Sequence, residues 1–240
     1  MLRALPLILV TAAAPTLASA EPLEAPALVR SKSRIDLRSS LSVPVASVPL
    51  RDGARFAKGD LLVAFDCSTL SAERRAAKAA ESLATMEVRA KTRLLAHGAV
   101  GRDEVARAKA QKSKAAADRA AIAARMKGCR IAAPFDGRVV HVSVRRSQLP
   151  APGTSVMTII DDRRLDVEIV APSRWLAWVE TGQGFSIAIE ETGRTVSATV
   201  TAIGSEVDPV SRTVRLFGAL EDGARILPGM SGTARFEARR

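Results

Sequence analysis

Apolar and polar positions follow two different periods along this chain, and the change of period separates its predicted elements. Residues 43–66 and 137–161 are short apolar stretches broken by glycine-containing turns, which is typical of short β-strands. Residues 68–127 instead place apolar or small side chains in steps of three and four, which predicts helices. From residue 162 onward, alternation returns in longer runs, which predicts a second group of strands.

The two short strand regions are copies of one pattern. A shift of 94 positions aligns residues 43–66 with the region that begins at Gly137, without a gap. The matched positions are Val48 with Val142, Leu50 with Val144, Arg51 with Arg145, Gly59 with Gly153, Leu62 with Val156 and Phe65 with Ile159. This internal repeat predicts two equivalent β-hairpins that pack face to face.

The segment between the repeats predicts two antiparallel helices, at about residues 68–95 and 102–127. The chain is expected to reverse at Ala96–Gly101, where two glycines permit a sharp turn. Helices of roughly 27 residues would project about 40 Å. The stripes expected to face each other are Ala76, Ala80, Leu83, Met86, Ala90 and Leu94 in the first helix, and Val105, Ala108, Ala115, Ile122 and Met126 in the second.

The C-terminal region predicts a small β-barrel. Leu165–Val170, Phe185–Ile189 and Val196–Ile203 alternate between apolar and polar residues, and two further strands are expected around Thr213–Leu220 and Thr233–Glu237. A short helix is expected around Trp175 and Trp178, which are interpreted as residues that plug the barrel. Five or six antiparallel strands with one helix are typical of such a barrel.

Positive charge is concentrated in the predicted helical arm. The chain has a formal net charge of +11, and residues 68–127 hold 14 Lys and Arg against 6 Asp and Glu, a net +8. Such an arm could track nucleic-acid phosphates, but it carries no aromatic residue for base stacking between residues 66 and 134. A solvated surface, or attraction to acidic partner helices or anionic headgroups, is the simpler explanation.

The N-terminus has the features of a secretory signal peptide. Arg3 precedes an apolar run at Leu5–Val10, and Ala18-Ser19-Ala20 provides small residues for cleavage after Ala20. No later apolar stretch reaches the roughly 20 residues that a membrane-spanning helix requires. We therefore expect residues 1–20 to be a signal peptide and residues 21–34 to be a linker. The mature protein is expected to be exported and soluble, and to be held at any membrane by protein contacts.

Four short motifs resemble those of the membrane fusion proteins, the HlyD-like periplasmic adaptor subunits of tripartite efflux and type I secretion systems. The motifs are DGARFAKGDLLVAFD at residues 52–66, APFDGRVV at residues 133–140, SRTVR at residues 211–215 and LPGM at residues 227–230. The resemblance covers roughly residues 35–238, and APFDG and LPGM are its most specific parts.

The resemblance implies a mainly β fold with an α-helical hairpin. A split lipoyl or barrel-sandwich domain would occupy residues 35–66 and 129–161, interrupted by a coiled-coil hairpin at residues 67–128. A β-barrel domain would follow at residues 162–238.

Cys67 and Cys129 are the two cysteines of the chain, and both would lie at the base of an antiparallel hairpin. In an oxidising compartment, this placement predicts a disulfide between them. Two buried free thiols are the alternative. A metal or catalytic pair is disfavoured, because no CxxC motif occurs and both histidines lie elsewhere in the sequence.

The resemblance also implies that the hairpin tip binds an outer-membrane channel protein. The tip residues assigned to partner binding are Arg93, Leu94, Leu95, His97, Gly98, Val100, Gly101 and Arg102. Tips that bind the common efflux channels carry an arginine, a leucine and a serine, but only Leu94 matches here. Ala90 and Gly101 stand at the other two positions, and Arg89 and Arg93 lie nearby. His97 is interpreted as an ordinary exposed turn residue, with pH sensing as the alternative.

No catalytic constellation, cofactor site or metal site is predicted, and an enzyme is not expected. The leading hypothesis is a homo-oligomeric adaptor between an inner-membrane transporter and an outer-membrane channel. Because no transmembrane helix is expected, a resistance-nodulation-division (RND) transporter is favoured over an ABC transporter. The alternatives are a lipoyl or biotinyl carrier and a soluble periplasmic binding protein or metal chaperone. Nucleic acid is not expected as a partner.

Overall fold

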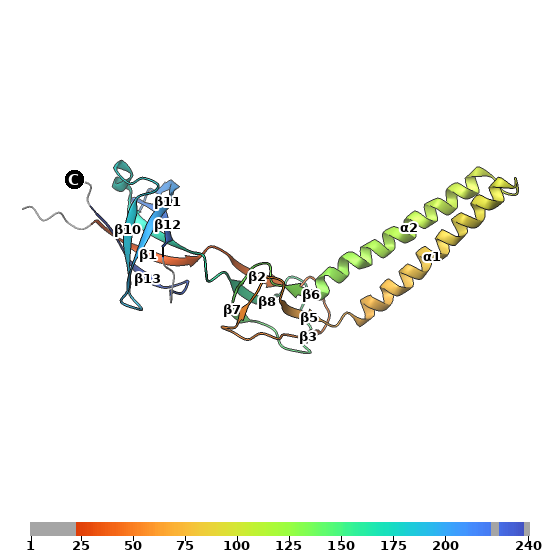
Figure 1. The fold of residues 1–240 in the computed structure, drawn as a ribbon, viewed down its shortest axis with the longest axis horizontal. Coiled ribbons are helices and arrows are strands. Elements are labelled where there is room, and N and C mark those ends of the chain that lie inside the picture. Colours follow the sequence, from red (N-terminus) through yellow and green to blue (C-terminus); the bar gives the residue numbers. More distant parts are fainter. Residues whose placement is uncertain (1–22, 222–225, 238–240) are drawn as a thin grey trace, which may run out of the picture. The chain divides into compact units, whose positions relative to one another are not determined.

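The computed structural model describes residues 23–221 and 226–237 (Figure 1). The predicted signal peptide at residues 1–20, with its cleavage site after Ala20, lies outside the described residues. In chain order the elements are β1 (Leu23–Ser31), β2 (Arg34–Arg38), β3 (Val45–Ser47), β4 (Arg55–Phe56), β5 (Leu61–Phe65), α1 (Ser68–Ala96), α2 (Arg102–Met126), the 3-10 helix η1 (Lys127–Cys129), β6 (Arg130–Ala132), β7 (Gly137–Val142), β8 (Ser155–Ile160), β9 (Leu165–Pro172), the 3-10 helix η2 (Ser173–Ala177), β10 (Gly184–Ile189), β11 (Thr195–Asp208), β12 (Thr213–Leu220) and β13 (Ser231–Phe236).

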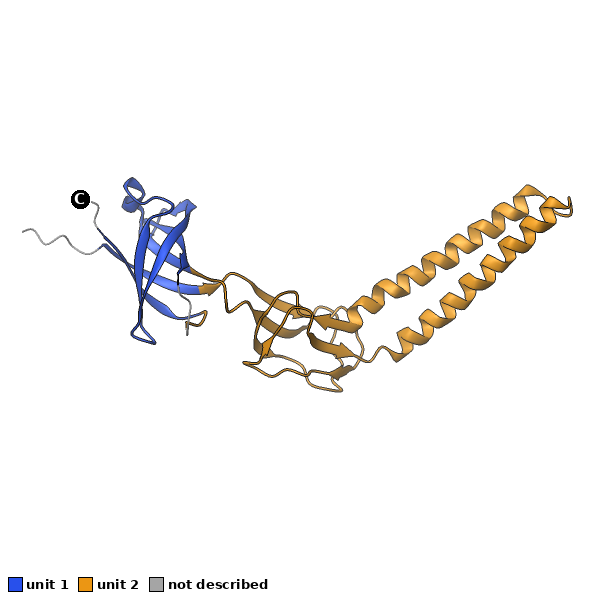
Figure 2. Ribbon diagram, in the orientation of Figure 1, with its two compact units in different colours: residues 1–29, 167–222, 229–240 blue, residues 30–166, 223–228 orange. Residues whose placement is uncertain are grey.

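The chain divides into two compact units (Figure 2). One unit combines most of β1 with the strands that follow Val167, and the other is built on Arg30–Asp166. The second unit contains a β-domain and the helical hairpin α1–α2, which we call the two-sheet domain and the arm. None of the described helices is both long enough and apolar enough to cross a membrane.

The two-sheet domain consists of a four-stranded sheet in the order β2-β8-β7-β4 and a three-stranded sheet in the order β3-β5-β6. Side chains from both sheets form one core, because Leu62 and Val63 of β5 are fully buried together with Val156, Met157 and Ile159 of β8. Apolar burial of this kind is the main stabilising contribution to a small β-domain.

The backbone confirms the internal repeat of 94 residues. Gly53 donates its N–H to the carbonyl of Val139 at 2.8 Å, and Ser147 donates its N–H to the carbonyl of Val45 at 2.8 Å. Adding 94 to Gly53 gives Ser147, and subtracting 94 from Val139 gives Val45, so the two hydrogen bonds are equivalent. Gly53 and Ser147 also share a left-handed backbone, with φ of 79° and 67°.

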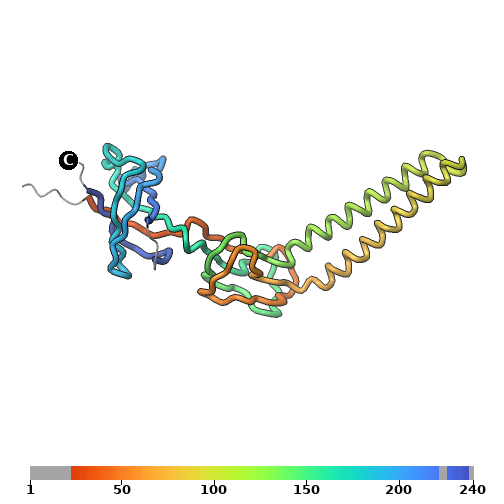
Figure 3. Tube along the Cα trace, viewed as in Figure 1, coloured from red at the N-terminus to blue at the C-terminus, as the bar shows by residue number. Residues whose placement is uncertain are grey.

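The two halves interlock more closely than the predicted face-to-face packing of hairpins. β2 from the first half pairs with β8 from the second, and Leu37 lies opposite Met157. In the equivalent pairing, β6 from the second half joins β5 from the first, and Ile131 lies opposite Val63. Each sheet therefore contains strands from both halves (Figure 3).

The linker predicted at residues 21–34 is wrong for its described part. Leu23–Ser31 forms β1, which pairs antiparallel with β13 and helps to close the barrel. Ala25, Ala27 and Val29 alternate inward and are buried, at 2%, 7% and 0% exposure. The alternation is real but consists of small residues around a proline, and the mixed charge of the segment obscured it.

The barrel unit has six strands in the closed order β1-β13-β10-β11-β12-β9, which confirms the predicted barrel. Its core follows the period of two, and Val167, Ile169 and Ala171 of β9 are fully buried. The expected short helix is the 3-10 helix η2. Its Trp175 is buried and packs edge-on against Phe236 of β13, with ring centroids 5.3 Å apart.

The arm is an antiparallel hairpin of α1 and α2 (Figure 1). Three ion pairs connect the helices: Lys91 with Glu104, Arg119 with Glu81 at 2.6 Å, and Arg125 with Glu73 at 3.6 Å. Because these charges are partly or largely exposed, each pair contributes little to stability, but together they favour one register of the two helices.

The predicted stripe of α2 is confirmed, whereas the predicted stripe of α1 is wrong. Val105, Ala108 and Ala115 of α2 are buried as expected. On α1, however, Leu83, Met86 and Leu94 are 64%, 57% and 42% exposed, and the buried residues are Leu70 and Ala84.

Ion pairs occupy the face of α1 that was expected to be apolar. Glu81 and Glu73 of α1 face α2 and pair with its Arg119 and Arg125, whereas Leu83 and Met86 face outward. An apolar period alone did not distinguish the two faces of α1.

Candidate partner-binding arm

The base of the arm is closed by a disulfide between Cys67 and Cys129, as predicted. Cys67 lies two residues after the end of β5 and Cys129 directly precedes β6, so the bond joins the two chain segments that enter and leave the arm. Its Cα atoms are 6.0 Å apart across a sequence separation of 62 residues. Leu41 and Leu70 pack with Cys129 in a small apolar cluster at this site.

The start of α1 is fixed by Asp66. Its carboxylate accepts a hydrogen bond from the backbone N–H of Ser68 at 3.0 Å. This bond holds the pKa of the Asp66 carboxyl below its ordinary value. A carboxylate at this end also interacts favourably with the helix dipole. The start of α1 is therefore hydrogen-bonded to the residue that follows β5, the last strand of the first repeat.

The APFDG motif connects the two halves of the two-sheet domain at the exit of the arm. Asp136 accepts a hydrogen bond from the backbone N–H of Lys58 at 2.6 Å and forms an ion pair with Arg163. The Lys58 N–H, and after it the Arg163 guanidinium, hold the pKa of Asp136 below its ordinary value. The ring of Phe135 lies 6.3 Å from that of Phe56, between ring centroids. The motif thus has a structural role at the base of the arm.

Gly137 completes the motif because β7 and β8 approach each other closely there. A Cβ atom added at Gly137 would lie 2.1 Å from the carbonyl oxygen of Ile160, far inside van der Waals contact. Only glycine fits this backbone position without a shift of the strand.

The tip of the arm reverses at Gly98, whose φ is 70°. The N–H of Ala99 bonds the carbonyl of Leu94 at 2.9 Å, and the N–H of Gly98 bonds that of Leu95 at 2.9 Å. These bonds close the end of α1 with a glycine in the left-handed region. The eight residues assigned to partner binding all lie at this reversal; Arg93, Leu94, His97, Gly98, Gly101 and Arg102 are exposed, whereas Leu95 and Val100 are half-buried.

The exposure of side chains at the tip shows which of them a partner could contact. Leu94 is 42% exposed and available. Ala90 is half-buried and Gly101 has no side chain. The guanidinium groups of Arg89 and Arg93 are exposed and make no hydrogen bond or ion pair with any residue that the structure describes. An aliphatic side chain and two free cations therefore dominate this end of α1.

An ion pair between Lys91 and Glu104 lies one turn below the tip. Its hydrogen bond from Lys91 holds the pKa of the Glu104 carboxyl below its ordinary value. Asp103 and Glu104 occupy the first turn of α2, where negative charge is favourable. The tip loop is therefore anchored on both helices.

One surface feature of the arm was not predicted from the sequence. The exposed apolar residues of α1 form a continuous stripe with steps of three and four, and α2 carries an exposed stripe of small residues with the same steps. The α1 stripe is Ala72, Ala76, Ala79, Leu83 and Met86, and the α2 stripe is Ala106, Ala110, Ser113, Ala117, Ala120 and Ala124. The spacing on α1 was visible in the sequence, but the face that it covers was not.

Among the residues that the structure describes, no group of three or more His, Cys, Asp or Glu side chains is placed to hold a metal ion. The exposed surface of the arm consists mainly of cations, small residues and a few aliphatic side chains.

No protein-family model matches the chain. Two curated relatives are each 28% identical: an uncharacterised protein of Haemophilus influenzae over 206 residues and the nodulation protein NolF of Rhizobium meliloti over 211 residues. The matches cover 85% and 82% of this chain but 54% and 58% of the relatives. The chain thus spans a little over half the length of the curated relatives that it matches.

Solved structures resemble this chain over most of its length. A MacA–MexA chimeric protein, which contains the Pseudomonas aeruginosa MexA alpha-hairpin domain, has a TM-score of 0.78 at 18% identity and covers 89% of this chain and 80% of its own. The membrane fusion protein Spr0693 of Streptococcus pneumoniae has a TM-score of 0.75 at 14% identity and covers 90% of this chain and 99% of its own. The chain has the fold of a membrane fusion protein. The periplasmic adaptor protein EmrA shares this membrane fusion protein fold, with a TM-score of 0.52 at 13% identity over 90% of this chain and 99% of its own.

Proposed function

We propose that this protein is a periplasmic adaptor of the membrane fusion protein family, which joins an inner-membrane transporter to an outer-membrane channel in a tripartite efflux or secretion complex. The observation that carries the proposal is the arm, a long hairpin that leaves the two-sheet domain at a disulfide and ends in an exposed tip. A long arm on a compact β-domain suits a protein that reaches a partner at a distance.

The two-sheet domain is assigned in this proposal as a split lipoyl or barrel-sandwich domain. The repeat of 94 residues and the exchange of strands between its halves support the assignment. A lipoyl or biotinyl carrier would need a modified lysine in a tight turn between the two halves. Here the arm occupies that position, from Asp66 to Cys129, so the adaptor is favoured over the carrier.

The tip is assigned as the site that contacts the outer-membrane channel. Leu94, Arg89 and Arg93 supply the exposed apolar and cationic contacts, and Arg102 adds a further cation on the other helix. The partner surface is expected to be acidic with a small apolar pocket. An RND transporter is the favoured inner-membrane partner, with an ABC transporter as the other candidate, and this choice rests on analogy with the family.

The protein is assigned as a homo-oligomer, and the two exposed stripes of the arm support this. Leu83 and Met86 project from one helix, while the stripe of the other helix offers only small side chains between which they could insert. Both stripes lie away from the α1–α2 seam. Large side chains on one face and small ones on another favour contact between neighbouring copies, in the manner of knobs and holes in a coiled coil.

The proposal is tested by crosslinking from the tip in intact cells. A photoreactive residue at Ala99 is suitable because Ala99 is exposed, whereas Gly98 requires a left-handed backbone. We expect Ala99 to capture an outer-membrane channel protein, and Leu94→Asp to reduce that capture at least tenfold. A photoreactive residue at Ala117, halfway along α2, serves as the matched control and is expected to capture a second copy of this chain. An Ala99 probe that captures no outer-membrane protein in cells that make the complete transport system would contradict the proposal.

A further inference from the structure

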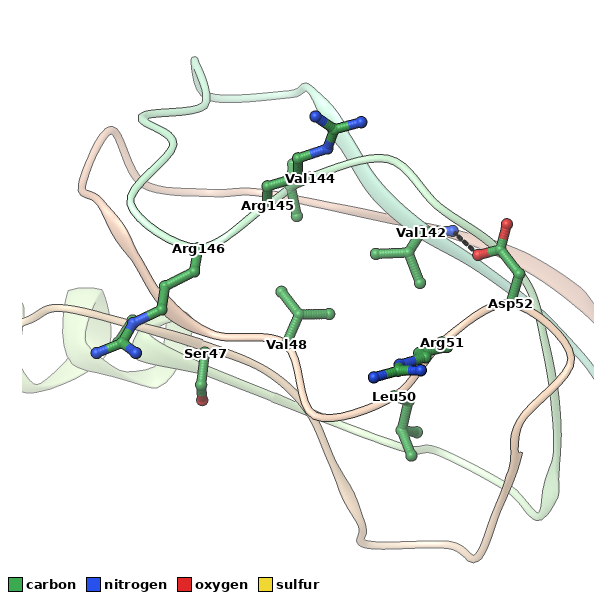
Figure 4. Close-up of a pocket in the computed structure, with 10 residues that line it drawn as sticks. Ser47, Val48, Leu50, Arg51, Asp52, Val142, Val144, Arg145 and Arg146 are labelled. Carbon is green, nitrogen blue, oxygen red and sulfur yellow. Dashed lines mark hydrogen bonds between the residues drawn. The ribbon is translucent and has the colours of Figure 1, made fainter.

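A groove lies between two equivalent turns of the two-sheet domain (Figure 4). One side is formed by residues 46–52, which end β3 and lead toward β4, and the other by residues 142–146, which follow β7. The groove has a volume of about 810 Å³, which is within the range of sites for small molecules.

The floor of the groove is aliphatic and built from the repeat. Val48 and Val142 are equivalent positions 94 residues apart, and so are Leu50 and Val144. Val144 is buried at 3% exposure, and the other three are partly buried against the core of the two-sheet domain. In Figure 4 the side chains of Val48 and Val142 occupy the middle of the groove. The floor is therefore rigid and apolar.

Three arginines surround this floor. Arg51 and Arg145 are equivalent positions of the repeat, and Arg146 is the next residue. In Figure 4 the guanidinium groups of Arg51 and Arg146 lie on opposite sides of Val48, and that of Arg145 turns outward at the rim. None of the three guanidinium groups makes a hydrogen bond or ion pair with another described residue.

The one carboxylate in the groove does not neutralise them. Asp52 accepts a hydrogen bond from the backbone N–H of Val142 at 2.7 Å, and its other oxygen lies 3.1 Å from Nδ1 of His141. The bond with His141, and then that with the Val142 N–H, hold the pKa of Asp52 below its ordinary value. Asp52 is thus committed to holding the two turns together, and the groove keeps an excess of positive charge.

We infer that this groove binds an amphiphilic anion, a small molecule in which an aliphatic chain or ring system carries a carboxylate or phosphate. The apolar part would lie on the aliphatic floor, and the anionic group would be held at its edge by one of the two flanking guanidinium groups, that of Arg51 or that of Arg146. A guanidinium presents parallel N–H donors that match a carboxylate or phosphate, and its charge is always present near neutral pH. An inorganic anion alone would leave the apolar floor in water, and an uncharged amphiphile would leave the guanidinium groups unpaired.

The inference concerns the two-sheet domain by itself and does not depend on the adaptor function. An acidic peptide segment, or a second copy of the chain, could also present apolar and anionic groups. The small molecule is favoured because the groove is short, open to solvent and bounded by two tight turns, with Gly53 and Ser147 both in the left-handed region. Such turns leave a recess rather than an extended edge.

The test uses the purified full chain with dodecyl phosphate below its micelle concentration, by titration calorimetry and by NMR of 13C-labelled valine, leucine and methionine methyl groups. We expect saturable binding with the largest methyl shifts at Val48 and Val142. Inorganic phosphate and dodecyl maltoside, which each lack one half of the ligand, should bind at least tenfold more weakly. Replacing Arg51, Arg145 and Arg146 together with serine should weaken dodecyl phosphate binding at least tenfold, a change of about 1.4 kcal/mol.

Two controls separate the groove from the basic arm. Replacing the exposed cations Arg74, Arg75 and Lys78 with serine removes the same charge from α1 and should leave binding unchanged. Val48→Thr together with Val142→Thr preserves the shape of the floor but adds hydroxyl groups, and it should weaken dodecyl phosphate binding while leaving inorganic phosphate binding unchanged. Equal binding by the two serine variants, or methyl shifts at Leu83 and Met86 in place of the valines, would overturn the inference. Binding of inorganic phosphate as tight as that of dodecyl phosphate would also overturn it.

Discussion

Single residues at the exit of the arm decide how the two repeats meet. Asp136 bonds the Lys58 turn of the first repeat and the Arg163 side chain beyond the second, and Gly137 allows β7 to run against the end of β8. Asp136 thus supplies a polar connection between the repeats, and the neighbouring Gly137 permits a close approach of two strands.

Replacing Gly137 with alanine should lower the free energy of unfolding by about 1–3 kcal/mol, the usual cost of overpacking. The physical reason is the 2.1 Å approach of the new Cβ to a backbone oxygen, which cannot rotate away. Urea denaturation followed by circular dichroism measures the change. Gly184→Ala is the matched control, because no atom lies within 4 Å of a Cβ placed there, and it should be nearly neutral. Equal stabilities of the two variants would contradict this account of the motif.

The carboxyl of Asp136 predicts a dependence of stability on pH. Its folded-state pKa is held below the ordinary 3.8, first by the Lys58 N–H and then by Arg163. The folded protein therefore binds this proton less readily than the unfolded chain. The stabilisation is complete above about pH 4 and is lost as the pH falls through the folded-state pKa.

Asp136→Asn should consequently flatten the part of the stability curve below pH 4 and lower stability at neutral pH. Thermal denaturation from pH 2 to pH 7 measures both effects. A curve of Asp136→Asn parallel to that of the native protein would show that this carboxyl does not contribute.

At the scale of elements, the arm depends on its base because its own seam is thin. The residues buried along the helices are few and mostly small: Leu70 and Ala84 on α1, and Val105, Ala108 and Ala115 on α2. Alanine side chains allow a close approach of the helices but bury little area, so the apolar contribution is modest. The disulfide and the apolar cluster of Leu41, Leu70 and Cys129 therefore hold the start of α1 and the end of α2 together at the base of the arm.

Replacing Cys67 and Cys129 together with serine should lower the free energy of unfolding by up to about 4 kcal/mol, since a loop of this length is constrained in the unfolded chain. Denaturation of the native and double-serine proteins measures the loss. Intact-mass measurement after alkylation is the control, and the unreduced native protein should carry no alkylated thiol. Two alkylated thiols in that sample would contradict the disulfide.

The elements differ in how much of them the sequence predicts. The strands of the two-sheet domain and the barrel follow from a period of two, and the repeat follows from a fixed offset, because each depends on local pattern. β1 was missed because Ala25 and Ala27 are too small to mark a buried face in a segment of mixed charge. The outward face of α1 was misassigned because the face that meets α2, on which Glu73 and Glu81 pair with Arg125 and Arg119, depends on the partner helix and is not set by the apolar period of α1 alone.

For the whole molecule, the position of the tip residues at the end of a hairpin follows from two helical periods separated by two glycines. The residues that line the groove between the two equivalent turns were also visible in the sequence, as matched positions of the repeat. Their assembly into one groove was not, because it depends on turns that come together only when both repeats are folded. Arg51 and Arg145 are 94 positions apart and share one recess.

The stripe on α1 predicts an effect on assembly without an effect on folding. Replacing Leu83 and Met86 with glutamine should reduce self-association at least tenfold, because both side chains are more than half exposed in a single copy. Analytical ultracentrifugation measures the association, and circular dichroism is expected to show an unchanged melting temperature. Ala84→Gln, one residue away in the seam with α2, should instead lower the melting temperature. A native protein that stays monomeric at high concentration, or a double variant that associates normally, would contradict this role of the stripe.

The exchange of strands between the two repeats has a consequence for folding kinetics. The paired strands β2 and β8, and likewise β5 and β6, are separated in sequence by the whole arm. Because its strand pairs join residues far apart in the sequence, the two-sheet domain has a high contact order. If α1 and α2 pair first, the reversal at Gly98 brings Cys67 and Cys129 close together. Most of the entropic cost of closing the loop between them is then met before the sheets form. The arm would then speed the folding of the domain from which it projects. A shorter arm, with both helices trimmed equally, should still allow rapid folding. An unstructured insert as long as the native arm should slow the folding of the two-sheet domain.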